Sequence, residues 1–523
     1  MKPKEESNSG GTSARRRLGK QQISGQDVVD EAESAPLIAQ TPEDLIMEET
    51  AEKERLRKLN MRLACNIAIP VFYFMLGFNL KLPFVASRQY LRRVLKASPA
   101  NQAMVLDVIA QIPWQLKLFY AFASDSFPIN GQRRKPMMIF GIIIFTISWV
   151  LLGLLRPAPS IGWTSVLLFL GCFGMIMTDV MADCLVVEKV ALEKGDEIGK
   201  LQTQVWFLRF AGSFVGMAAG GILLQFVKMT EQNIFFLQGL TQVLLVLPLV
   251  LMLEDPPVQV QSVAKQLSDI WVTIKDRRVS YLIFFMFVVG CTPNAGSAFT
   301  NFILGPLKFS DFSYMVLNLV GIMCSAIGIW LYRLYFRGSN LRVFVFVIIF
   351  LGAALQLLPL ILVSRINLKW GISDFWFAIG DELIVELVGI MIVMPMLIVC
   401  AKVSPENVEG SVYSFLTMSS NISFAIGNSF SALITAKLGI SVTEFKNLWL
   451  LICLASASSL LPLFFVWLLP SKIESTARIR ISEGLDEKYK STRVGLFSIL
   501  LIFGGLVYSV VASIAKVANP KNE

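Results

Sequence analysis

Residues 137–155 read MMIFGIIIFTISWVLLGLL and contain no charged side chain. An α-helix rises 1.5 Å per residue, so about 20 such residues span the roughly 30 Å hydrocarbon core of a bilayer. Comparable apolar runs recur about a dozen times along the 523-residue chain, and short charged segments separate them. Because so much apolar surface is strongly disfavoured in water, the chain is predicted to be an all-α membrane protein.

The composition excludes several classes of protein. Hydrophobic residues make up 54% of the chain and charged residues 16%, against about 25% charged residues in soluble domains. The net charge of +9 comes from basic residues clustered in particular loops, which is typical of topology signals rather than of a nucleic-acid partner. The chain has no histidine, so Ser-His-Asp triads and HExxH zinc sites are excluded. We therefore expect no enzyme activity, cofactor or metal.

Twelve membrane spans are predicted from the apolar runs. The basic segment 53–62 places the N-terminus in the cytosol, and the plasma membrane is favoured over an internal (vacuolar or plastid) membrane. The segment 81–96 contradicts the charge rule, because it is expected to be outside and yet is basic. A further stretch, 494–515, is expected to form an extra C-terminal helix that crosses the membrane or lies at its surface. The twelve spans are roughly 63–80, 100–123, 137–155, 161–187, 202–227, 234–253, 281–304, 312–332, 343–364, 374–401, 411–436 and 447–469.

Two landmarks indicate an internal repeat. Gly131 and Gly338 follow the second and eighth spans and are 207 positions apart, and Gly199 and Gly410 follow the fourth and tenth and are 211 apart. Parallel repeats of six spans are the plan of major-facilitator carriers, so we predict the major-facilitator fold with two six-helix bundles. The predicted domains are a disordered cytosolic tail (1–60), an N-terminal bundle (61–253), a cytosolic linker (254–279), a C-terminal bundle (280–470) and a tail with the extra helix (471–523).

Four charged residues of the N-terminal half are predicted to share one membrane layer. Asp179 and Asp183 are four residues apart and lie on one helix face, and Lys117 and Arg209 lie at a similar depth by helix rise. One interpretation is a neutral structural network, since the attraction between paired buried ions roughly offsets the free-energy cost of removing them from water. The other is that an anionic substrate competes for Lys117 or Arg209 and releases a carboxylate to bind a proton.

The tenth span carries a second acidic group. Glu382 and Glu386 are four residues apart beside Asp381, and Glu386 is expected near the bilayer midplane with no cation at that depth in the C-terminal half. Such carboxyl groups are candidates for proton coupling, with Glu386 and Asp381 foremost, and a hydrogen-bonded neutral structural acid is the alternative. Asn294 and Asn301 of the seventh span are candidate substrate contacts, although interhelical hydrogen bonding is the ordinary role of such residues.

The loop after the second span is predicted to act as a gate. Asp125 is followed by Arg133 and Arg134, and buried arginines bind carboxylates at the rim of such bundles. We expect a clamp that holds one conformation and breaks in the other, and plain topogenic charge is the alternative.

Four segments together resemble the folate–biopterin transporter family of the major-facilitator superfamily. The resemblance covers roughly 63–470, with Leu118 standing where the family often has Pro and Val408 separating Asn407 from Glu409. The segments are 98–135 with PWQLK and SD, 178–213 with TDVMAD and VVE, 380–415 with the MP motif, and 447–463 with NLW.

The resemblance implies a secondary active transporter of folates or pterins such as biopterin, coupled to protons and working by alternating access. It further implies that cavity aromatics such as Trp206 stack on a flat pteridine. The expected partners are the substrate, protons and the lipid bilayer, and the chain is expected to be a monomer. Two alternatives stay open: a major-facilitator carrier of another small organic anion, and a non-transporting membrane receptor.

Overall fold

The computed structural model describes residues 42–60, 63–97, 101–102, 105–106, 109–193, 197–255, 257, 262–405, 408–441, 444–473 and 488–518. The chain divides into two units, residues 1–54 and 55–523. Helix α1 (Pro42–Leu59) begins in the first unit. The sequence predicts that the tail 1–60 is disordered, and its residues 42–59 are helical instead. Its residues 1–41 lie outside the described part of the chain.

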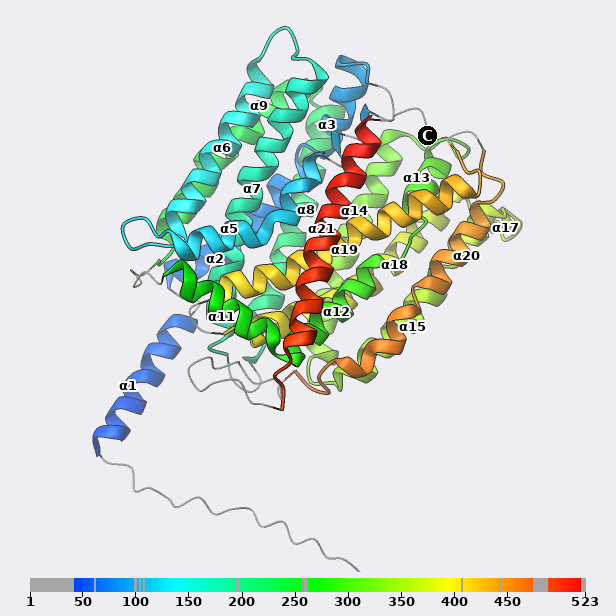
Figure 1. Ribbon diagram of the computed structural model, residues 1–523. Helices are drawn as coiled ribbons and strands as arrows, with labels where there is room; N and C mark the ends of the chain where they lie inside the picture. The colour runs from blue at the N-terminus through cyan, green and yellow to red at the C-terminus, as the bar shows by residue number, and fades with distance from the viewer. Residues whose placement is uncertain are drawn as a thin grey trace, which may run out of the picture. The chain divides into compact units, whose positions relative to one another are not determined.

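Eleven helices of the described part are long and apolar enough to cross a membrane. This makes the protein a multi-pass membrane protein, drawn as a bundle of long helices in Figure 1. The main helices of the N-terminal half are α2 (Ala64–Lys81), α3 (Phe84–Gln89), α5 (Lys117–Ser126), α6 (Lys135–Leu154), α7 (Ile161–Val190), α8 (Lys200–Gln225), α9 (Glu231–Thr241) and α10 (Leu247–Met252). Those of the C-terminal half are α12 (Arg277–Cys291), α13 (Gly296–Leu304), α14 (Asp311–Leu331), α15 (Leu341–Leu355), α16 (Pro359–Val363), α17 (Ile366–Lys369), α18 (Asp374–Val403), α19 (Glu409–Lys437) and α20 (Leu448–Ser458).

Two predicted spans differ from the expected continuous apolar helix. The second is a 3₁₀ helix (Ile109–Leu116) that contains Pro113 and runs into α5, because proline cannot donate the backbone hydrogen bond of an α-helix. The eleventh predicted span corresponds to α19, a single helix of 29 residues. It carries many polar side chains and is not one of the helices that are apolar enough to count as membrane spans. The first span continues past residue 80, since the helical stretch Cys65–Val94 is one candidate span.

Small residues let helices approach closely inside the N-terminal half. A Cβ atom on Gly212 of α8 would lie 1.9 Å from the carbonyl oxygen of Phe74 on α2, and one on Gly77 would lie 1.8 Å from that of Arg209. Glycine is therefore required where α2 and α8 cross, as is common between membrane helices. The two halves meet along α8 with α14 and along α5 with α19.

Two further helices flank the C-terminal half. The predicted linker contains α11 (Val263–Lys275), whose Gln266 side chain is buried. The extra C-terminal helix is α21 (Thr492–Ala518), shown in red in Figure 1, and Thr492–Ala512 qualifies as a membrane span. It packs on α12 and α19, and a Cβ on its Gly505 would lie 2.8 Å from Ile422. The additional helix expected at 494–515 is therefore present.

Candidate functional site

A cavity of about 360 Å³ lies between the two halves. One wall comes from α2, the 3₁₀ helix and α8, and the other from α14 and α18. Both walls carry charge, and two tryptophans contribute flat apolar surface. The lining residues are Leu80, Lys81, Trp114, Trp206, Arg209, Phe210, Ser213, Asn318, Gly321, Ile322, Ser325, Glu382 and Glu386.

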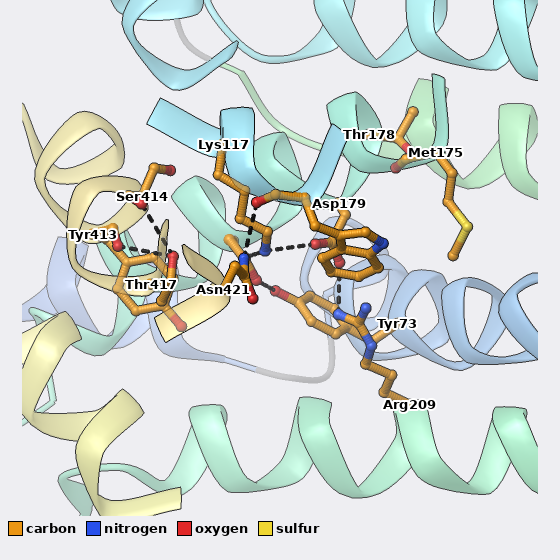
Figure 2. A network of polar contacts seen from close by, with 12 residues as sticks. Tyr73, Lys117, Met175, Thr178, Asp179, Arg209, Tyr413, Ser414, Thr417 and Asn421 are labelled. Carbon is orange, nitrogen blue, oxygen red and sulfur yellow. Dashed lines mark hydrogen bonds and ion pairs between the residues drawn. The ribbon is translucent and has the colours of Figure 1, made fainter. Parts of the chain in front are cut away.

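The central ion cluster consists of Lys117, Asp179, Asp183 and Arg209, and it borders this cavity through Arg209. Figure 2 shows Lys117, Asp179 and Arg209 of this cluster. Lys117 Nζ lies 2.8 Å from Asp179 Oδ2 and 3.1 Å from Asp183 Oδ2. Arg209 Nη1 lies 2.6 Å from Asp179 Oδ1. All four side chains are buried, so the structure brings together the residues that the sequence placed in one layer.

Neighbouring aromatic groups complete the central ion cluster. The Tyr73 hydroxyl donates to Asp183 Oδ1 over 2.6 Å. Lys117 Nζ lies 5.2 Å from the centre of the Trp114 ring, and Arg209 Cζ lies 5.2 Å from that of Trp206. Such cation–π contacts stabilise a buried cation. The four charges sum to zero and each is paired, so the cluster holds no spare charge in this conformation.

The acidic residues Asp381 and Glu386 of α18 have different surroundings. Glu386 lines the cavity and is exposed to it, and the Ser325 hydroxyl donates to its Oε2 over 3.0 Å. Asp381 is buried, and its Oδ1 has no hydrogen-bond donor among the described residues. The prediction of no cation near Glu386 concerned the C-terminal half alone, and the other half contributes a cation to the same cavity. Lys81, from α2 in the other half, lines the same cavity.

The predicted asparagine contacts lie elsewhere. Asn294 is exposed at the break between α12 and α13, where its Nδ2 donates to Asn428 Oδ1 over 2.9 Å. Asn301 is exposed on α13. Neither is among the residues that line the cavity. By contrast, Asn421 of α19 donates to the Trp114 carbonyl oxygen over 2.9 Å and so joins the two halves beside the central ion cluster (Figure 2).

The predicted gate residues form a cluster in which Asp125 and Arg134 are buried and Arg133 is partly exposed. Arg134 Nη1 lies 2.7 Å from Asp125 Oδ1, and Arg134 Nη2 lies 2.9 Å from Glu188 Oε1. Arg133 is more loosely placed, 3.7 Å from Asp125. The Ser411 hydroxyl of α19 donates to Asp125 Oδ2 over 2.6 Å. These five residues form the gate cluster, and the hydrogen bond between Ser411 and Asp125 is the contact by which it connects the two halves.

Two acidic residues hold the chain around the gate cluster. Asp255 Oδ2 accepts hydrogen bonds from the backbone N–H groups of Arg134 and Lys135 over 2.7 and 2.9 Å, and so caps the N-terminus of α6. Glu193, between α7 and α8, accepts from the N–H groups of Gly199 and Leu201 over 2.6 and 2.8 Å.

Glu193 also lies at the interface between the halves. Lys402 of α18 donates to its carbonyl oxygen over 3.1 Å. Burial raises the pKa of the Glu193 carboxyl to about 7, against the opposing effect of the two N–H donors and the cation.

Several of these partners were missed by sequence reasoning. Ser411 and Asp255 are far from Asp125 in the chain and carry no local motif. Lys81 had a signal, because it opens the basic segment that contradicts the charge rule. A cation that breaks the topology pattern is a candidate for burial in a cavity.

Comparisons with known proteins agree with this architecture. The proton:xylose symporter XylE, a major-facilitator protein, superposes with a TM-score of 0.58 at 11% identity, over 79% of this chain and 97% of that one. This likeness concerns the fold alone, and it establishes the major-facilitator fold.

Sequence relatives are named as transporters. The folate-biopterin transporter of Synechocystis is 28% identical over 77% of this chain and 81% of its own length. Folate transporter 1 of Plasmodium falciparum is 27% identical over 75% and 77%. Probable folate-biopterin transporter 2 of Arabidopsis thaliana is 25% identical over 83% and 88%. The sequence profile of the BT1 family matches residues 76–492, and because this match takes in most of the chain, the protein belongs to the BT1 family of membrane transporters.

Proposed function

We propose that this protein is a secondary active transporter of folates or pterins that works by alternating access and is coupled to protons. The observation that carries the proposal is the charged, tryptophan-lined cavity between the two halves. Tryptophan rings bind flat ring systems by stacking, and carboxylates opposite cations suit a ligand that has both N–H donors and an anionic group. The names of the relatives point to the same substrates.

Alternating access is supported by polar contacts that join the two halves on one side of the molecule. The gate cluster and Glu193 tie the halves together at the end expected to face the cytosol. In this proposal the conformation shown is closed on that side, and the gate cluster must separate for substrate to leave there. The proposed boundaries of the moving bodies are 61–253 and 280–470, joined by the linker 254–279, and the proposed unit is a monomer in the plasma membrane.

Proton coupling is proposed for Glu386 and Asp381, with Asp179 and Asp183 as a second group. Glu386 faces the cavity and Asp381 is buried close by on α18. A carboxylate that meets the substrate in one state and is shielded in the other links proton binding to substrate movement. Lys117, Arg209 and Trp206 are the proposed substrate contacts of the other half.

The test is uptake by the purified protein in liposomes. Labelled folate or biopterin is supplied outside, with the pH inside higher than outside or equal to it. We expect accumulation above the external concentration only with the pH gradient. If neither compound enters, the proposal is overturned. The alternative of another small organic anion is supported if unlabelled anions of a different class drive counterflow and folate does not.

A further inference from the structure

The cations near the cavity are not equivalent. Lys117 contacts two carboxylates, and Arg209 is paired with Asp179 through Nη1. Their positive charge is balanced within the central ion cluster. Recruiting either one to a substrate requires breaking an existing buried ion pair, which is costly in a membrane.

Lys81 differs from both. It is half-buried and lines the cavity, and no carboxylate of the described residues lies within ion-pair distance of it. Its electrostatic partner among these residues is Glu386 on the opposite wall, which interacts with it at longer range. Lys81 Nζ lies 4.7 Å from the centre of the Phe84 ring. The attraction of a ring face replaces only part of the hydration free energy that a cation loses when it leaves water. Because Glu386 offsets its charge only at a distance, Lys81 can bind an anion from outside the protein without breaking a contact ion pair.

The opposite wall has the complementary chemistry. Glu382 and Glu386 project from α18 into the same cavity. A pteridine ring with an amino group beside a ring N–H offers two donors in a row, which match one carboxylate. Between the two walls, Trp114 and Trp206 provide the stacking surface. A ligand that lies across the cavity then has its ring at α18 and its other end at α2.

We propose that Lys81 binds the carboxylate of the substrate's tail and so discriminates folates, which carry a glutamate tail, from pterins, which carry no carboxylate. This inference rests on the proposed function of folate or pterin transport. It names the residue that decides which of the two substrate classes binds tightly.

The test compares two substrates on the same protein. Wild type, Lys81→Met, Lys81→Arg and Arg93→Met are reconstituted in liposomes, and uptake of folate and biopterin is measured as a function of concentration. Arg93 is the matched control, since it is an exposed cation further along the same helical stretch. Removing one partner of a desolvated charge pair costs about 2 kcal/mol or more. The half-saturating folate concentration of Lys81→Met should therefore rise about 30-fold or more.

Biopterin uptake by Lys81→Met should stay within about threefold of wild type, because biopterin has no carboxylate for Lys81 to bind. That result also shows that the variant is folded. Lys81→Arg should restore most of the folate affinity, and Arg93→Met should resemble wild type for both substrates.

Three outcomes would overturn the assignment. If Lys81→Met weakens folate and biopterin equally, Lys81 has a structural or gating role. If it weakens neither, the substrate anion binds elsewhere. If wild type transports neither compound, the proposed function fails, and the assignment of Lys81 fails with it. The wild-type measurement therefore distinguishes this case from the other two.

Discussion

At the residue scale, Lys117 is the residue on which the central ion cluster depends most. It contacts both Asp179 and Asp183, so Lys117→Met leaves Asp183 with the Tyr73 hydroxyl and takes one of two cations from Asp179. Stranding a buried carboxylate costs about 3–5 kcal/mol. We expect Lys117→Met to lower the unfolding temperature in detergent well below that of Lys437→Met, an exposed control.

A double variant makes this prediction specific to the pair. Lys117→Met combined with Asp183→Asn removes one of the stranded charges, so part of the lost stability should return. Equal unfolding temperatures for Lys117→Met and Lys437→Met would show that the central ion cluster contributes no net stability.

Glu386 is a second residue for which a substitution can distinguish a role in proton coupling from a purely structural role. Glu386→Gln resembles the protonated acid and keeps an oxygen for the Ser325 hydroxyl. We expect the variant to exchange labelled for unlabelled substrate across the membrane and to fail to concentrate substrate under a proton gradient. Asp381→Asn is the companion variant, because Asp381 is buried nearby on the same helix. Accumulation by Glu386→Gln with the pH dependence of wild type would make Glu386 a structural acid.

At the element scale, the crossing of α2 and α8 depends on the absence of a side chain. Gly212→Ala places a Cβ 1.9 Å from the backbone oxygen of Phe74, and a backbone atom cannot move without separating the helices. We expect a loss of about 1–3 kcal/mol in the free energy of unfolding. Gly504→Ala in α21 is the control, since nothing lies within 4 Å of its Cβ, and it should be neutral or slightly stabilising. The same loss in both variants would contradict close packing at the crossing.

The loop between α7 and α8 should respond to pH. Burial raises the pKa of Glu193 from 4.5 to about 7, so the conformation that buries this group holds its proton more tightly than one that exposes it. The stabilisation is complete below about pH 4.5 and is lost as the pH rises through about 7. The unfolding temperature of wild type should therefore fall from pH 5 to pH 8 more steeply than that of Glu193→Gln. Parallel curves would show that Glu193 does not titrate in this range.

Some features of the site could be predicted from the sequence, and others depend on how the helices pack. The central ion cluster could be predicted because opposite charges inside apolar runs at one depth have few partners other than one another. Lys81 could not be placed, because its position depends on the first helix continuing past residue 80 and on how α2 faces α18. The break at Pro113 and the partners Ser411 and Asp255 of the gate cluster depend on tertiary packing, which hydropathy alone does not encode.

At the scale of the whole molecule, one buried cysteine can report on the proposed separation of the two halves. Cys184 of α7 is fully buried, and its Sγ faces Gly410 of α19 across the interface between the halves. Separation of α7 from α19 on the gate side must expose this thiol. The other six cysteines are Cys65, Cys172, Cys291, Cys324, Cys400 and Cys453, and replacing them with Ser or Ala leaves Cys184 as the single reactive group.

Asp125→Asn in that background should increase the rate at which a membrane-impermeant thiol reagent labels Cys184. Asp125 pairs with Arg134 inside the N-terminal half and accepts the Ser411 hydrogen bond from the other half. Removing the charge of Asp125 therefore weakens the contact of this residue that crosses the interface, the Ser411 hydrogen bond. A hydrogen bond to a charged group contributes about 1.5–3 kcal/mol, and tenfold corresponds to about 1.4 kcal/mol, so about tenfold faster labelling is expected. The matched control, Asp374→Asn, breaks a partly exposed pair with Arg365 at the start of α18, the end of that helix opposite to Lys402, and should leave the rate unchanged. Equal rates for Asp125→Asn and the parent would mean that the gate cluster does not hold the two halves together, and the closed side would then depend on apolar packing alone.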